Sequence, residues 1–120
     1  MADLRSILTH YTAVEGVSAA VVVDVDGLVI DGTPPDGLDM ETLGMVASNT
    51  AALTKAIGRE VQRGDALQSI LEFEGGTVML EPLGDLATLL VVCDSTASLG
   101  KLRFVAKRHR PELLAAINAL

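Results

Sequence analysis

Two short stretches carry residue types and spacings that could do chemistry. Ser98 and Lys101 match the Ser-x-x-Lys pattern of some acyl-enzymes, but the companion motifs of that chemistry are missing. Ser98 is therefore predicted to cap a helix. The run from Asp24 to Gly27 resembles the start of a calcium-binding loop, yet no glutamate follows at the spacing that would close such a loop. This run is predicted to be a hairpin turn instead.

Metal-binding and nucleophilic side chains are few and scattered. Cys93 is the only cysteine, and His10 and His109 are far from it in the chain, whereas a structural zinc site needs several such ligands close together. Both histidines are expected to be solvated at helix ends, and Cys93 to be a small buried side chain. The sequence contains neither GxxxxGK[ST] nor GxGxxG. We therefore predict no catalytic residue, no cofactor and no metal, and we do not expect an enzyme.

Length and composition narrow the class of protein further. The chain has 120 residues, and residues 1–120 are predicted to form one domain with its own core. A single thiol is typical of a reducing compartment. No stretch approaches the ~20 apolar residues of a membrane span, and no signal-peptide pattern is visible. The net charge of −7 argues against nucleic acid as the main partner. We expect a cytoplasmic protein with no nucleic-acid partner and no direct membrane insertion.

The charges are distributed unevenly along the chain. The first 41 residues hold eight acids and one base, Arg5. Five of the nine bases lie near the C-terminus. Such asymmetry usually marks solvated faces and less often a docking surface for an opposite charge. The five C-terminal bases are Lys101, Arg103, Lys107, Arg108 and Arg110.

Apolar periodicity and turn residues predict an α/β (α+β) fold with the order α-β-β-α-β-β-β-α. We expect a five-stranded antiparallel sheet with helices on both faces. The first and fifth strands are apolar at both alternating sets of positions, so they should pair at the centre of the sheet. Pro111 should kink the last helix or begin a second segment. The predicted ranges are helices 2–13, 40–58 and 98–120 and strands 17–25, 28–30, 67–73, 77–83 and 86–93.

The second predicted helix, which Asp39 should cap, has no strongly polar side. One side is apolar and is expected to pack on the sheet: Leu43, Val46, Ala47, Thr50, Leu53 and Ile57. The opposite side carries Met45, Ser48, Asn49, Ala52 and Ala56, and no charge occurs between Glu41 and Lys55. A helix of this kind is buried on both sides. We predict that a second copy of the chain covers the outer side; a loop of the same chain is the alternative.

The third predicted strand gives a second reason to expect a dimer. Residues 67–73 should lie at an edge of the sheet, and they contain no Pro or Lys to protect that edge. Pairing with the same strand of another copy would satisfy its backbone groups. The predicted dimer-interface residues are Met45, Ser48, Asn49, Ala52, Ala56, Leu67, Ser69 and Leu71.

Two stretches resemble a known family. VASNTAALTKAIGRE at 46–60 and LLVVCDSTASLGKLRFVAK at 89–107 are similar to the bacterial gliding-motility proteins of the roadblock/LC7 (dynein light chain-related) family. The resemblance implies the roadblock fold, a homodimer, and binding to a small Ras-like GTPase as a regulator or GTPase-activating partner. It further implies that the GTPase docks across the paired second helices. The residues on or near that surface would be Ser48, Asn49, Ala52, Lys55, Ala56 and Arg59.

Two other functions remain compatible with the sequence. A structural dimer or adaptor would bind its partners without affecting nucleotide turnover, and the C-terminal bases would be its contact candidates. A small-molecule sensor of the PAS, GAF or profilin-like kind would also cover one antiparallel sheet with helices. The scarcity of aromatic residues, which are common in ligand pockets, weighs against the sensor.

Overall fold

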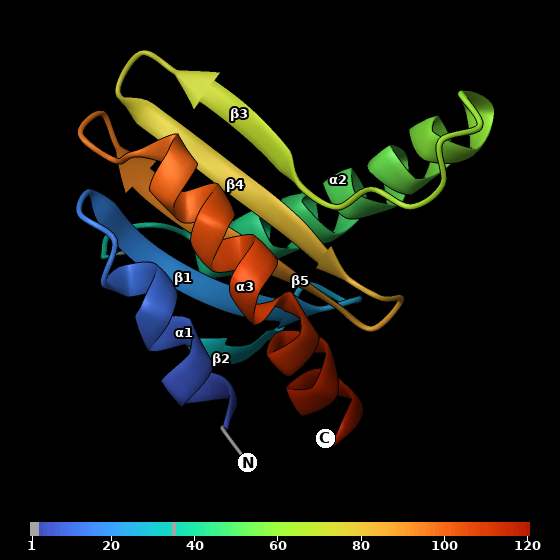
Figure 1. Ribbon diagram of the computed structural model, residues 1–120, viewed down its shortest axis with the longest axis horizontal. Helices are drawn as coiled ribbons and strands as arrows, with labels where there is room; N and C mark the ends of the chain where they lie inside the picture. Colours follow the sequence, from blue (N-terminus) through green and yellow to red (C-terminus); the bar gives the residue numbers. More distant parts are fainter. Residues whose placement is uncertain (1–2, 35) are drawn as a thin grey trace.

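The computed structural model describes residues 3–34 and 36–120, which form one sheet with helices on both faces (Figure 1). The element order is the predicted α-β-β-α-β-β-β-α. The predicted start of the first helix at residue 2 lies outside the described residues. The elements are α1 (Leu4–Thr12), β1 (Val17–Asp24), β2 (Val29–Gly32), α2 (Met40–Glu60), β3 (Ser69–Phe73), β4 (Gly76–Leu83), β5 (Ala87–Asp94) and α3 (Leu99–Asn118).

The five strands are antiparallel throughout and lie in the order β2-β1-β5-β4-β3. The prediction that the first and fifth strands pair at the centre is confirmed, with Val21 opposite Leu90. Val21, Val22 and Val23 are fully buried, because helices cover both faces at this point. β3 lies at the edge, as predicted, and is paired only with β4 among the described residues.

One face of the sheet is covered by α1 and α3, which pack side by side and hold most of the core (Figure 1). Tyr11 of α1 and Leu102 of α3 are completely buried there. Ser98 caps α3 by accepting a hydrogen bond from the Lys101 amide, as predicted. Pro111 lies inside α3, which continues through it as one helix, so no second segment begins at this residue.

The other face is crossed by α2 alone, which we call the α2 face. Asp39 caps this helix by accepting hydrogen bonds from the Glu41 and Thr42 amides. Its core contacts are few, because only Gly44 and Ala47 are buried along the whole helix. Figure 1 shows the C-terminal half of α2 projecting beyond the sheet. Within the described residues, no helix is both long and apolar enough to cross a membrane.

Candidate protein-interaction surface

Small residues let the first half of α2 approach the sheet closely. A Cβ added at Gly44 would lie 2.0 Å from the Gly27 carbonyl oxygen, so only glycine fits. Gly27 itself has a φ of +83° in the turn between β1 and β2, which confirms the predicted hairpin. Four residues along the helix from Gly44, the Ser48 hydroxyl donates a hydrogen bond of 2.7 Å to the Val25 carbonyl. The position of α2 is therefore set at its N-terminal half.

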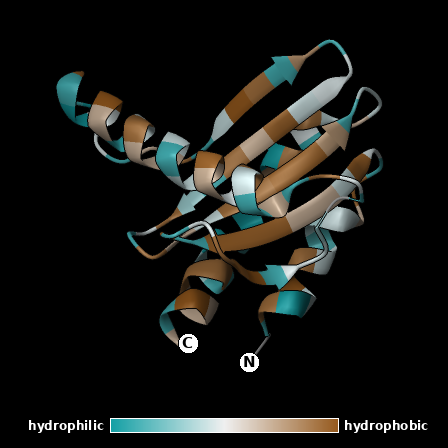
Figure 2. Cartoon of the chain, turned by 180° about the vertical axis from the view of Figure 1, so that it is seen from behind, coloured by the Kyte–Doolittle hydropathy of each residue, from teal (hydrophilic) through white to brown (hydrophobic). Residues whose placement is uncertain are grey.

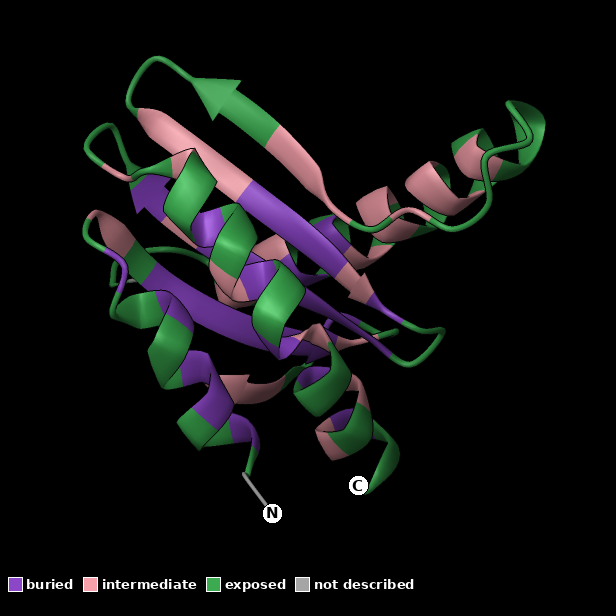
Figure 3. Ribbon diagram, in the orientation of Figure 1, coloured by how far each residue is buried: buried purple, intermediate pink, exposed green. Residues whose placement is uncertain are grey.

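The apolar side of α2 packs on the sheet only at Leu43 and Ala47, whereas the sequence predicted that the whole side would do so. Val46, Leu53 and Ile57 are 53%, 64% and 60% exposed, and we call these three residues the α2 flank. The helix contacts the sheet through a side that carries Leu43, Gly44 and Ala47. Small side chains allow the backbone of α2 to approach the sheet most closely. Gly44 and Ala47 therefore form the contact, although they are less apolar than the residues of the α2 flank. Figure 3 shows the outer turns of α2 as exposed or intermediate.

The edge strand adds a second exposed apolar region on the same face. Leu71 pairs with Val78 in the β3–β4 ladder, and Val78 packs against the small cluster beneath α2. Leu71 and Phe73 therefore point toward the α2 face, because alternate residues of a strand share one face. Phe73 is 61% exposed, and Leu67 just before the strand is exposed as well. We call Leu67, Leu71 and Phe73 the edge patch; in Figure 2 apolar segments appear on both α2 and the strands of this face.

The predicted interface residues all lie on this side of the molecule, and the structure separates them into two sets. Met45, Asn49, Ala52 and Ala56 are exposed on the outer side of α2, and Ser48 is partly covered. Leu67 and Leu71 are exposed at the edge, and Ser69 is partly buried.

Sequence reasoning missed Val46, Leu53, Ile57 and Phe73 as exposed residues. The signal for the first three was present in their spacing, because they form one apolar side of α2. From the sequence, this side of α2 was assigned to the sheet because it is apolar. In the structure, the size of the side chains determines where α2 packs closely on the sheet.

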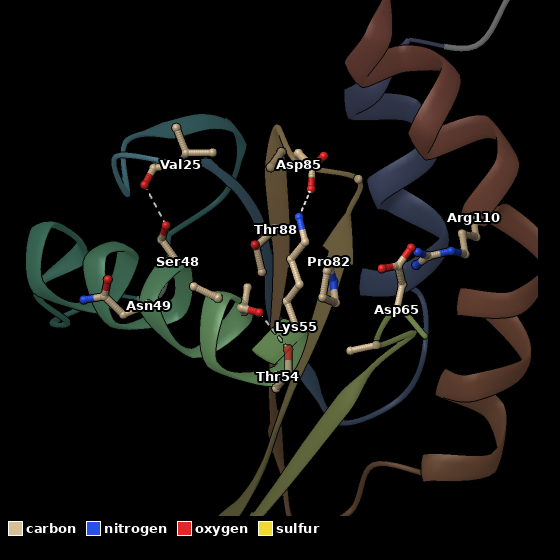
Figure 4. A pocket seen from close by; sticks show the side chains of 15 residues that line it. Val25, Ser48, Asn49, Thr54, Lys55, Asp65, Pro82, Asp85, Thr88 and Arg110 are labelled. Atoms are coloured by element: carbon tan, nitrogen blue, oxygen red, sulfur yellow. Dashed lines mark hydrogen bonds and ion pairs between the residues drawn. The ribbon is translucent and has the colours of Figure 1, made fainter. Parts of the chain in front are cut away.

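A groove of ≈ 480 Å³ lies on the other side of α2, between the helix and the β4–β5 turn (Figure 4). Ser48, Ala52 and Lys55 line it from the helix. Lys55 extends along the groove to Asp85 and forms an ion pair with it, which lowers the pKa of Asp85. Of the GTPase-facing candidates, Lys55 is thus held in this groove, while Arg59 is exposed further along α2.

A buried polar cluster connects α1, α3 and β4 to the segment that leads into the edge strand. Glu81 is 1% exposed; its carboxylate accepts hydrogen bonds from Arg110, at 3.1 Å, and from the Tyr11 hydroxyl, at 3.4 Å. Arg110 also donates to the Leu67 carbonyl at 3.4 Å. Burial raises the pKa of Glu81 to about 7, and the charge of Arg110 opposes this rise. Burial and the neighbouring carboxylate raise the pKa of Tyr11.

The residues that could have served a metal site do not come together. Cys93 is buried at the end of β5, as predicted. The prediction that His109 is solvated is wrong: it is 7% exposed, stacks on the His10 ring at 4.0 Å and lies 3.0 Å from a Glu112 oxygen. Among residues 3–34 and 36–120, no group of three or more His, Cys, Asp or Glu side chains is placed to hold a metal ion.

Comparison with known proteins agrees with this architecture. The family model of the Roadblock/LC7 domain matches residues 5–93. The chain belongs to the Roadblock/LC7 family. No curated protein matches the sequence significantly. The predicted recognition of the family and its fold is therefore confirmed.

Solved structures of roadblock proteins share the whole fold. Myxococcus xanthus MglB is 18% identical with a TM-score of 0.84, covering 99% of this chain and 100% of that chain. The gliding protein MglB from Thermus thermophilus is 23% identical with a TM-score of 0.83, covering 95% of this chain and 87% of that chain. A third structure, MglB in a tetrameric arrangement, is 23% identical with a TM-score of 0.82, covering 94% and 86%.

Proposed function

We propose that this roadblock domain is a non-enzymatic homodimeric regulator of a small Ras-like GTPase. The observation that carries the proposal is the pair of uncovered apolar regions on one face, the α2 flank and the edge patch. A monomer would leave both regions in water. A second copy related by a two-fold axis would cover them with the same residues, because a two-fold interface is self-complementary.

The edge strand supports this mode of assembly. β3 is five residues long and pairs with β4 on one side only within the described residues. Its free N–H and C=O groups would be satisfied by antiparallel pairing with β3 of the second copy, which would join the two sheets into one. The projecting half of α2 would then extend over the partner's part of the joined sheet.

The outer side of α2 is the proposed contact with the GTPase. After dimerisation through the flank and the edge, Ala56 would still be exposed. The groove beside the helix would remain open as well, with Ser48, Asn49, Ala52 and Lys55 lining it. Arg59 adds an exposed positive charge close to this surface. The resemblance to gliding-motility roadblock proteins supports a Ras-like GTPase as the occupant. Regulation would act by repositioning the GTPase's own residues, since we assign no catalytic residue to this chain.

A binding titration tests the proposal. The protein is titrated against the small Ras-like GTPase of the same organism, loaded with GDP or with a non-hydrolysable GTP analogue, while sedimentation equilibrium reports the mass of each species. We expect two copies of the protein bound to one GTPase, with tighter binding to the GTP-like state. A monomeric protein would contradict the dimer.

Turnover of GTP separates the regulator from an adaptor. A GTPase that binds the dimer and hydrolyses GTP faster or slower supports regulation. Binding with unchanged turnover would leave an adaptor of the GTPase. No binding in either nucleotide state, with the dimer intact, would exclude the GTPase regulator and favour the structural dimer or the small-molecule sensor.

A further inference from the structure

The chain contains two phenylalanines, and both are exposed, on opposite faces of the sheet. Phe73 belongs to the edge patch and would be covered in the proposed dimer. Phe104 is 65% exposed on α3, and α3 lies on the face away from α2. The dimer proposed above therefore leaves Phe104 uncovered.

Phe104 lies at the centre of the outward side of α3 and is surrounded by positive charge. The buried positions Leu102, Ala106 and His109 place the opposite side of the helix around residue 104. α3 holds five of the nine bases of the chain and only one of its sixteen acids. In the part of the chain that the structure describes, four exposed bases around Phe104 take part in no ion pair. These bases are Lys101, Arg103, Lys107 and Arg108.

A groove of ≈ 550 Å³ between α1 and α3 begins beside Phe104. Val14 and Val105 contribute apolar lining, Glu15 contributes one carboxylate at the α1 end, and His10 contributes one wall that is held by its stacking on His109. Gly100 leaves space in it: an added Cβ there would meet only the Ser98 hydroxyl, at 3.9 Å. An apolar side chain can therefore lie in this shallow groove beside Phe104 while its neighbours reach the bases of α3.

We propose that this groove and the bases around Phe104 dock an acidic segment of another protein. An apolar side chain of the segment packs against Phe104, and flanking carboxylates pair with Lys101, Lys107 and Arg108. The charge of the partner follows from complementarity, because α3 is positive in a chain whose net charge is −7. Exposed ion pairs alone contribute little to affinity, so contact with Phe104 is required for stable binding.

A protein segment suits this surface better than a membrane or a nucleic acid. A bilayer is flat and would leave the groove unfilled, and one exposed phenylalanine is a small apolar anchor for peripheral binding. A nucleic acid is a polyanion and would be repelled by the overall negative charge of the domain. Because the surface lies on the face opposite α2, the docked segment and a GTPase can be bound at the same time, and the inference does not depend on the GTPase.

Selection from a random peptide library displayed on phage tests the inference. The wild-type protein is the target, and the Phe104→Ser variant is used for counter-selection. We expect the enriched peptides to contain Asp and Glu around one Leu, Ile or Phe. Labelled copies of these peptides are then titrated by fluorescence anisotropy, and the Lys107→Glu and Arg108→Glu double variant should bind at least about tenfold more weakly, a difference of about 1.4 kcal/mol.

The matched control is the Arg59→Glu and Arg63→Glu double variant, which changes the charge equally at α2 and the loop after it and should bind the peptides as the wild type does. Far-ultraviolet circular dichroism of every variant reports folding. Enriched peptides without acids, peptides that bind the Phe104→Ser variant equally, or no enrichment would each overturn the inference. The inference would also be overturned, and the surface assigned to a membrane, if no peptide bound and the wild type co-sedimented with phosphatidylserine vesicles. The Lys107→Glu and Arg108→Glu double variant would then fail to co-sediment.

Discussion

The two faces of the sheet are built from similar residues but are packed very differently. Beneath α1 and α3, a large cluster of buried apolar side chains includes Tyr11, Leu89 and Leu102. Beneath α2, the buried cluster is small, and Leu53 and Ile57 of the helix remain exposed. The comparison indicates that the α1/α3 face supplies most of the buried core, while the α2 face leaves apolar area exposed, which the proposed dimer would cover. The same difference predicts which substitutions alter folding and which alter assembly.

The largest expected effect is on folding, and it comes from the α1/α3 face. Leu102→Ala removes a completely buried side chain and should lower the free energy of unfolding by about 2–5 kcal/mol. Leu53→Ala removes the same atoms from an exposed position of α2 and should change the unfolding of the monomer by about 0.5 kcal/mol or less. Urea denaturation, carried out at a protein concentration below the dimer dissociation constant, measures the free energy of unfolding of both variants. Equal losses for the two variants would contradict the division between the faces.

The next effect concerns assembly and shows which side of α2 forms the dimer. Leu53→Glu places a charge on the α2 flank and should raise the dimer dissociation constant about 100-fold, or about 2.7 kcal/mol. Ala52→Glu places the same charge one residue away, on the side predicted from the sequence as the dimer interface. Sedimentation equilibrium of the two variants compares them directly. Dissociation by Ala52→Glu alone would support the sequence prediction, and a stable dimer in both cases would exclude α2 as the interface.

A smaller effect should appear as a pH dependence of folding from the α1/α3 face. The pKa of Glu81 is raised from 4.5 to about 7 in the folded chain, so the folded state holds this proton more tightly than the unfolded state. Its contribution to stability is complete below pH 4.5 and is lost as the pH rises through 7. The loss should reach about 1–3 kcal/mol.

Glu81→Gln provides the comparison for this pH dependence. Denaturation curves recorded between about pH 5 and 8 should show that the free energy of unfolding of the wild type falls as the pH rises. The fall should be smaller in Glu81→Gln, because the amide does not titrate. The same decline in both proteins would exclude Glu81 as its source.

The smallest effect on stability is expected at the groove beside α2. Lys55 forms its ion pair with an exposed Asp85, so Lys55→Met should leave the thermal midpoint and the dimer unchanged. Its affinity for the GTPase should fall about 2–10-fold, because a positive side chain is lost from the proposed docking surface. Arg5→Met, which removes a base from the α1/α3 face, is the control and should bind normally.

The sequence predicted the element order, the central pair of strands and the helix caps because these depend on local patterns. Every residue from Ala19 to Val23 is apolar, and Asp39 and Ser98 precede apolar helical runs. The side of α2 that faces the sheet was predicted correctly at Leu43 and Ala47 and wrongly at the three residues of the α2 flank. Its contact depends on the close approach of Gly44 to Gly27, two residues from different elements.

The buried polar contacts could not be predicted for a related reason. Glu81 and Arg110 are 29 residues apart, and nothing in either local sequence shows that one neutralises the other. His109 looks like a polar residue on a basic helix, yet its ring is covered by His10 from α1. Local sequence patterns do not predict the burial or the partners of a residue when another helix or strand determines them.

In the proposed dimer, local unfolding of the projecting half of α2 should depend on the protein concentration. The turns around Leu53 and Ile57 have little of their own sheet beneath them, so their amide hydrogens should exchange quickly in the isolated monomer. Association would cover these turns and slow their exchange by mass action. Val21 to Val23 in β1 are buried in the monomer itself and should stay strongly protected from exchange even after dilution to the monomer. One exchange experiment over a dilution series would therefore read out assembly from the end of a helix and folding from the middle of the sheet.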